Sequence, residues 1–201
     1  MIRALILMAA MPLAACAALK GGDQPVTMRL SPHFAAAATA PVPGPSFAVA
    51  QAQARGVTGA LRYAYVDAAA PGEVRQAATL FWEEPPTVTL SRALVAGLRT
   101  RFLTVTGPNL SLAADRRVVA VLDRFEEVTG GGAGGAQAVV AFDVTQVAGG
   151  KAVGAGRYCA TRPIGSAAGT ARAAAFAQAI EQAVTAFVQD AAAGTVSTAS
   201  C

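Results

Sequence analysis

Three extended segments joined by glycine-rich turns, followed by one amphipathic segment, constrain the fold of this 201-residue chain most strongly. The extended segments are residues 118–128, 136–147 and 152–161, and the turns between them are 129–135 and 148–151. Consecutive strands joined by such turns pair antiparallel. The amphipathic segment repeats apolar residues at helical spacing, at Ala173, Phe176, Ala177, Ile180, Val184, Phe187 and Val188. The pattern predicts an antiparallel meander and a long C-terminal helix packed on it.

Shorter elements are expected in the first half of the chain. Alternating apolar residues predict strands at residues 26–31, 47–49, 60–66 and 77–82, with Leu61, Tyr63 and Tyr65 on one face of the third. The prolines and glutamates of residues 83–86 then open a helix, because the first N–H groups of a helix lack partners and its positive end favours negative charge. This helix is expected to end near Leu103, with Arg101 in its last turn and an apolar face made of Leu90, Leu94, Val95, Leu98 and Phe102.

The order of these elements predicts the fold class. We expect one α/β (α+β) domain, with a mostly antiparallel mixed sheet and two main helices packed on one of its faces. Thr170 is expected to cap the start of the last helix, and Gly194 lies just past its end.

The N-terminus has the features of an export signal. Arg3 precedes an apolar run that is too short to span a bilayer, which needs roughly 20 residues. The run ends in Leu13-Ala14-Ala15-Cys16, which matches the bacterial lipobox. We expect cleavage before Cys16 and acylation of its thiol, although an ordinary signal peptide with an incidental cysteine is the alternative.

These boundaries divide the chain into four parts. Residues 1–15 are the signal peptide, residues 16–24 the lipidated cysteine and tether, residues 25–194 the domain, and residues 195–201 a C-terminal tail. The mature protein is expected on the periplasmic side of the envelope. Ala17 follows the lipid cysteine where an aspartate would favour inner-membrane retention in enteric bacteria, so the outer membrane is favoured.

The two remaining cysteines form an even set. Cys159 and Cys201 would face an oxidising compartment, where such pairs form disulfides. The alternative is two free thiols, with Cys201 on a loose tail.

Charge and composition argue against nucleic-acid binding and against catalysis. Removal of Arg3 with the signal peptide lowers the formal charge from +4 to +3, and no run of Lys and Arg exists. The single histidine, His33, lies in a proline-flanked loop, so neither a metal site nor a cofactor is expected. Asp123, Glu126 and Glu127 are interpreted as solvated strand charges rather than an acid/base pair, with Asp123 and Glu127 on one face and Glu126 on the other.

Trp82 is the candidate for a role beyond the core. With Glu83, Glu84 and Pro85 it would form a partner surface, since Trp is enriched at binding hot spots. The alternative is that Trp82 fills the junction between strand and helix.

The ordered motifs resemble a known family. A lipobox and a strand at residues 26–31 are followed by Phe81-Trp82-Glu83-Glu84-Pro85 before a helix, by Asp123-Arg124-Phe125-Glu126 in a strand, by the strand at 139–144, and by a final helix. This order resembles the ABC-type transport auxiliary lipoprotein family, which is associated with MCE-type (mammalian-cell-entry) lipid transport systems, including the paraquat-inducible system.

The resemblance implies a non-enzymatic accessory role. Its expected partners are an MCE-domain protein and the inner-membrane ABC transporter subunits, and a homo-oligomer is compatible with it. The expected cargo is a phospholipid or another hydrophobic compound, with a contribution to envelope integrity. Two alternatives stay open, namely a stand-alone lipoprotein that itself binds a hydrophobic ligand, and an envelope hydrolase.

Overall fold

The computed structural model describes residues 24–35, 43–110, 113–130, 135–199 and 201. The signal peptide, Cys16, Ala17 and the tether up to residue 23 lie outside the described residues, and so do residues 36–42 and residues 131–134 of the predicted turn 129–135.

A three-stranded antiparallel meander forms the largest part of the sheet, as predicted. Its strands are β7 (Arg116–Thr129), β8 (Gln137–Ala148) and β9 (Lys151–Pro163). Gly149 and Gly150 form the β8–β9 turn with φ values of 55° and 76°, which glycine adopts without steric cost. Strands β7 and β9 are longer than the sequence pattern predicts, while β8 has the predicted length and is shifted by one residue.

Six shorter strands complete a nine-stranded sheet around β7. Strands β2, β3 and β4 pair with β7 in parallel, one after another along the edge that β8 leaves free. Strand β5 pairs antiparallel with β4, while β1 and β6 pair in parallel with β5 and β2. The bounds are β1 Val26–Met28, β2 Phe47–Val49, β3 Gln53–Ala54, β4 Arg62–Asp67, β5 Val74–Trp82 and β6 Val105–Thr106, with a 3-10 helix at Gly56–Gly59.

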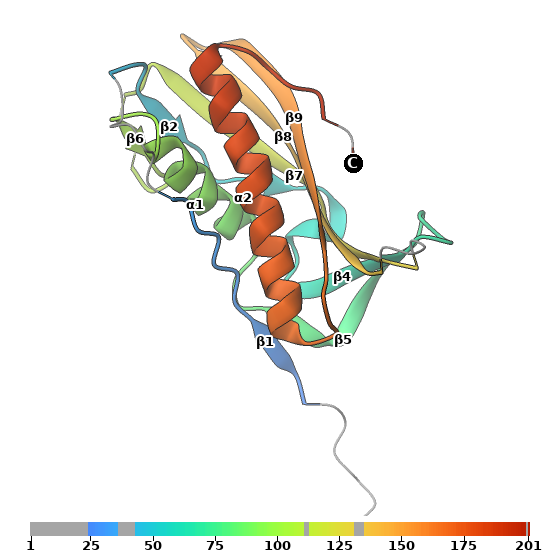
Figure 1. Ribbon diagram of the computed structural model, residues 1–201. Coiled ribbons are helices and arrows are strands. Elements are labelled where there is room, and N and C mark those ends of the chain that lie inside the picture. The colour runs from blue at the N-terminus through green and yellow to red at the C-terminus, as the bar shows by residue number, and fades with distance from the viewer. Residues whose placement is uncertain (1–23, 36–42, 111–112, 131–134, 200) are drawn as a thin grey trace, which may run out of the picture.

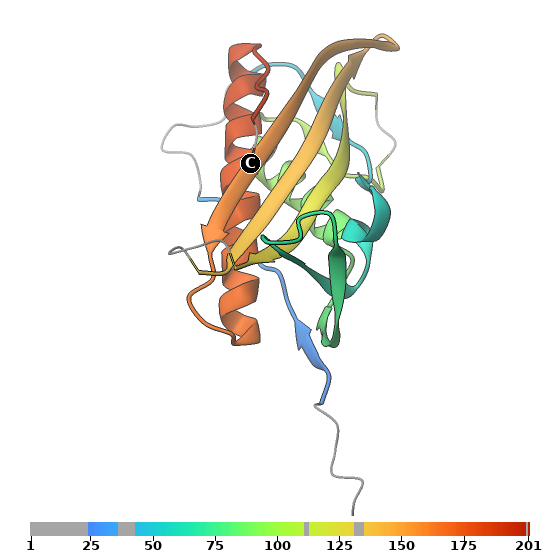
Figure 2. The same ribbon diagram turned by 90° about the vertical axis from the view of Figure 1, so that its right-hand side faces the viewer.

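Two helices pack on one face of this sheet, which confirms the predicted α+β class. Helix α1 spans Pro86–Arg99 and helix α2 spans Gly169–Ala193. Figure 1 shows the two helices side by side on the same side of the sheet, and in Figure 2 strands β7, β8 and β9 pass in front of them. Among the described residues, neither α1 nor α2 therefore covers the outer face of the meander.

The helix ends differ in part from the predictions. Helix α1 ends at Arg99, one turn before Leu103, and the Thr100 hydroxyl bonds to the Gly97 carbonyl at 2.7 Å. Arg101 consequently lies beyond the helix and not in its last turn. Thr170 does not cap α2, because the helix already begins at Gly169. Gly194 does end α2, in a left-handed conformation with φ of 69°.

The apolar pattern of β4 is also corrected. A register shift between Arg62 and Ala64 breaks the expected alternation. Tyr63 is buried, but Leu61 precedes the strand and is 46 % exposed. The core lies between the sheet and the helices, and its largest cluster of aromatic side chains is Tyr63, Trp82, Phe125 and Phe176.

Candidate functional site

The sequence predicts a partner surface at the junction between β5 and α1, but Trp82 of this junction is buried. The indole is 3 % exposed, and its ring centroid lies 5.4 Å from that of Phe125 and 5.2 Å from that of Phe176. Of the two interpretations of Trp82 that the sequence leaves open, burial therefore favours the one in which this side chain has no role in a partner surface. It fills the junction of strand and helix, and composition alone cannot distinguish the two positions.

The three neighbours of Trp82 remain accessible. Glu83 is exposed and pairs with Arg29, whose Nη2 lies 2.7 Å from the Glu83 Oε1. This hydrogen bond lowers the pKa of Glu83. Glu84, which is half-buried like Pro85, accepts a 2.7 Å hydrogen bond from the Thr89 hydroxyl and pairs with Arg92. These carboxylates join β1 and α1 to the junction, so they have structural partners already.

A buried ionic network lies beneath α2, where the sequence predicted solvated charges. Glu127 is 4 % exposed, and Glu126 is buried as well. The solvated interpretation is therefore wrong for both. A β-bulge between Leu122 and Arg124 shifts the alternation of β7, so that Phe125 and Glu127 join the core while Asp123 pairs with groups outside it.

Glu127 binds two groups of the core face. The Tyr63 hydroxyl donates to the Glu127 Oε2, and the Arg172 Nε donates to the same oxygen at 2.8 Å. The Arg172 guanidinium also lies 5.6 Å from the centroid of the Tyr63 ring, within range of a cation–π interaction. The three side chains thereby connect β4, β7 and the first turn of α2.

The electrostatics of this network keep its hydrogen bonds in place. Burial, followed by the hydrogen bond to Glu127, raises the pKa of Tyr63, so the phenol remains a donor. Burial alone lowers the pKa of Arg172, but the hydrogen bond and charge of Glu127 outweigh it, and the net shift is upward. A buried network whose hydrogen bonds are made within the core suits structural support better than proton transfer.

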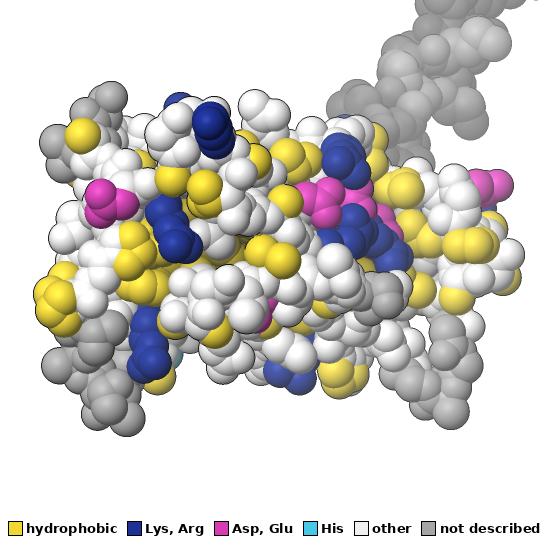
Figure 3. All heavy atoms as spheres, turned by 90° about the horizontal axis from the view of Figure 1, so that it is seen from above, with side chains coloured by type: hydrophobic (Ala, Val, Ile, Leu, Met, Phe, Trp, Pro, Cys, Tyr) yellow, Lys and Arg dark blue, Asp and Glu magenta, His cyan; other side chains and the backbone are white. Residues whose placement is uncertain are grey.

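A second charged group lies on the outer face of the meander. Asp123 and Asp143 alternate with Arg55 and Arg157, with 3.1 Å between Arg55 and Asp123 and 3.2 Å between Arg157 and Asp143. The hydrogen bond from Arg157 lowers the pKa of Asp123. Figure 3 shows one place on the surface where acidic and basic side chains lie side by side, while other basic side chains border apolar surface.

His33 lies at the surface beside Glu181. His33 is exposed, and its backbone N–H donates to the Glu181 Oε1 at 2.6 Å. Within the described ranges, no three His, Cys, Asp or Glu side chains are grouped so that they could hold a metal ion.

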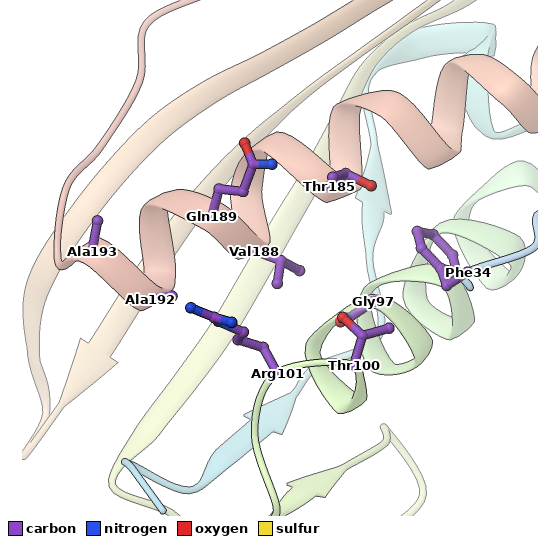
Figure 4. A pocket seen from close by; sticks show the side chains of 9 residues that line it. All are labelled: Phe34, Gly97, Thr100, Arg101, Thr185, Val188, Gln189, Ala192 and Ala193. Carbon is purple, nitrogen blue, oxygen red and sulfur yellow. The ribbon is translucent and has the colours of Figure 1, made fainter. Parts of the chain in front are cut away.

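A cleft of about 600 Å³ lies between the C-terminal halves of the two helices. In Figure 4 the Phe34 and Val188 side chains point into it, and Arg101 extends from the end of α1 towards Ala192 on α2. The helices meet beside it at Gly97, where a Cβ atom would lie 2.6 Å from the Val184 Cγ1. The sequence pattern does not predict this cleft, because the predicted helix extends to Leu103 and includes Arg101, whereas α1 ends at Arg99.

The C-terminal tail is attached to β9. Cys159 and Cys201 are joined in a disulfide, with Cα atoms 5.8 Å apart. Thr198 forms a parallel bridge to Arg157, and the Tyr158 hydroxyl donates to the Asp190 Oδ2 at 3.1 Å at the end of α2. In the part of the chain that is described, no helix has the length and apolar character needed to cross a bilayer.

Comparison with known sequences assigns the family. A profile of the ABC-type transport auxiliary lipoprotein component matches residues 66–192, which include the meander and both helices. The chain belongs to this family. Its members are auxiliary components of ABC-type transport, and the family assignment agrees with the resemblance seen in the motifs. A search of curated proteins finds no match.

Solved structures share the fold. The crystal structure of protein XCC0632 from Xanthomonas campestris, of family DUF330, is 20 % identical to this auxiliary lipoprotein, covers 84 % of this chain and 95 % of its own, and has a TM-score of 0.73. The crystal structure of an uncharacterized protein is 13 % identical, covers 83 % of this chain and 99 % of its own, and has a TM-score of 0.63. At these identities the likeness shows the fold alone.

Proposed function

We propose that this protein is a non-enzymatic accessory subunit of an MCE-type ABC transport system for phospholipid or another hydrophobic compound, and that it contributes to envelope integrity. It is held on the periplasmic side by an acylated Cys16, with the outer membrane favoured. The observation that carries the proposal is the family match over residues 66–192.

The geometry supports a binding role over a catalytic one. In the described residues, the carboxylates that could have formed an acid/base pair are engaged by arginines or by Tyr63. The accessible surface near the junction consists of Glu83, Glu84 and Pro85, which suit contact with a protein partner. From Cys16 to the first strand the chain spans at most about 35 Å, so the domain works close to one membrane.

The proposal is tested by capture from the native envelope. Full-length protein carrying a C-terminal affinity tag is cross-linked in cells and purified, and its partners are identified by mass spectrometry. We expect a permease, an ATPase and an MCE-domain protein, and we expect Cys16→Ser to lose both labelling by radioactive palmitate and these partners. Recovery of none of the three with the wild-type protein would count against the assignment.

Binding of a hydrophobic ligand by the protein itself is the second candidate. The inter-helix cleft favours it, since Phe34 and Val188 supply apolar walls and Arg101 supplies a charge at the rim. Lipid extracted from the purified protein should be near stoichiometric if this is correct, and Val188→Gln should remove it, whereas the exposed Val153→Gln should not. Extracts without lipid would rule out this second candidate, and the accessory role would remain.

A further inference from the structure

The C-terminal segment Val196–Ala199, called the tail strand below, covers part of the free edge of β9. In the sheet β9 pairs only with β8 among the named strands. The Arg157 N–H donates to the Ser197 carbonyl at 2.8 Å, and the Ala199 N–H donates to the Arg157 carbonyl at 2.9 Å. Because an uncovered strand edge is a template for pairing with another chain, the tail strand masks such a template.

Two glycines of β9 make room for the tail strand. A Cβ atom at Gly156 would lie 2.8 Å from the Ser197 carbonyl oxygen, which no real side chain tolerates. A Cβ atom at Gly154 would lie 3.3 Å from the Val196 Cγ1. Glycine within a strand marks a close approach of another backbone, and here that backbone is the tail strand.

The non-covalent attachment of the tail strand is slight. It consists of the two backbone hydrogen bonds to Arg157 and of a Val196 side chain that remains 50 % exposed. These contacts are few against the conformational entropy that the four residues of the segment lose on ordering. The disulfide between Cys159 and Cys201, closed just past the tail strand, supplies the missing constraint.

We propose that the tail strand is a redox-held cover of the β9 edge, and that reduction of the Cys159–Cys201 disulfide opens this edge to the tail strand of a second copy of the chain. The second copy is the partner that the geometry favours, because every copy carries the segment that fits beside Gly154 and Gly156. Exchange of an identical terminal segment between copies preserves all of these contacts.

The reducing agent is a dithiol. One of its thiolates attacks the exposed Cys201 sulfur and forms a mixed disulfide, which releases Cys159 as a thiol. Its second thiol then displaces Cys201, so that two electrons and two protons pass from the dithiol to the protein. The products are two free cysteines and an oxidised dithiol.

Hydrogen exchange of the full chain, kept dilute enough to remain monomeric, with and without dithiothreitol, tests the cover. The amides of Arg157 and Ala199 should exchange at least ten-fold faster after reduction, while the amides between β7 and β8 keep their protection. Cys201→Ser without reductant should reproduce the faster exchange. Unchanged protection of Arg157 and Ala199 in the reduced chain would overturn the proposal.

Isotope mixing tests the second copy. Unlabelled and nitrogen-15-labelled chains are reduced together, reoxidised at high concentration and digested without reductant. Disulfide-linked peptides that join Cys159 of one label to Cys201 of the other are expected. Gly156→Val should abolish them, because it blocks the edge, and Gly165→Val, whose added Cβ meets nothing within 4 Å, should not. Peptides of matched label alone from wild-type chains would refute exchange between copies.

Discussion

The two ends of α2 are fastened to the sheet in different ways. At its first turn Arg172 reaches Glu127 and Tyr63 in a buried, charged network. At its last turn Asp190 accepts hydrogen bonds from the Tyr158 hydroxyl and, at 3.2 Å, from the Thr195 hydroxyl. Beyond Thr195 the chain is closed onto β9 by a disulfide. The N-terminal end of α2 is therefore held by a buried charge pair. The C-terminal end is held by hydrogen bonds from two hydroxyl groups to Asp190 and by the disulfide that follows.

The difference predicts different tolerance to change. A buried charge whose partner is removed retains its desolvation cost and gains nothing in return. A cross-link removed near a chain end mainly restores freedom to the unfolded chain. The first end should therefore fail sharply when one partner of the charge pair is removed, whereas the second should weaken gradually and depend on the redox state.

Arg172→Met should cause the largest loss. It leaves Glu127 buried without its cation, and we expect the free energy of unfolding at pH 7 to fall by about 3–5 kcal/mol. Urea denaturation measures this. The double variant Arg172→Met with Glu127→Gln is the matched control and should recover much of the loss, since it removes the stranded charge as well. If Arg172→Met lowers the free energy of unfolding by less than about 1 kcal/mol, the network does not hold α2 on the sheet.

Removal of the disulfide should rank second. The bond closes a separation of 42 residues, for which chain entropy gives about 4 kcal/mol, and measured effects are typically about 2–4 kcal/mol. The double variant Cys159→Ser with Cys201→Ser should match the reduced wild-type protein in urea. If reduction destabilises the wild-type protein and the double variant alike, the effect of the reductant does not come from this bond.

Tyr158→Phe should have a smaller effect. The variant loses the hydrogen bond to Asp190 but keeps the packed ring, so about 0.5–1.5 kcal/mol is expected. Burial, followed by this hydrogen bond, raises the pKa of Tyr158 to about 12. The stabilisation is thus complete below the ordinary tyrosine pKa of about 10 and is lost as pH rises towards 12. The wild-type and variant unfolding energies should converge over that range.

Asp123→Asn on the outer face should have the smallest effect. Its pKa is lowered by the hydrogen bond from Arg157, so its contribution is present above the ordinary aspartate pKa of about 4 and is lost as pH falls through the lowered value. The expected loss at pH 7 is about 0.5–1 kcal/mol and should shrink below pH 4 and in high salt. A loss as large as that of Arg172→Met would contradict the contrast between buried and exposed charge.

The sequence pattern predicts the C-terminal end of α2 better than the N-terminal end. Gly194 is a local signal, and a cysteine pair is visible by counting, so the helix stop and the pairing of Cys159 with Cys201 could both be expected. The partner of Arg172 is 45 residues away in the chain. It faces the helix only because of the β-bulge after Leu122, and an extra residue in a strand leaves no periodic trace.

The core shows the same limit. The meander and both helices follow from periodicity, and the family from ordered motifs. The position of Trp82 does not, because burial of a large aromatic depends on Phe125 and Phe176, which come from two distant elements. The shape of the inter-helix cleft depends on where α1 ends. The sequence marks this end weakly, because the residue that follows the last turn is Thr100 and not a glycine.

The position of β7 in the sheet has a consequence for the order in which the protein assembles. Strands β2, β3 and β4 all find their partner in a strand that begins only at Arg116. When the chain is exported N-terminus first, these three strands therefore reach the far side of the membrane before β7, the strand with which they pair. Long-range pairing of this kind is slow and leaves edges open to aggregation. Association of the first half of the chain with other chains must accordingly be prevented until β7, β8 and β9 are available for pairing.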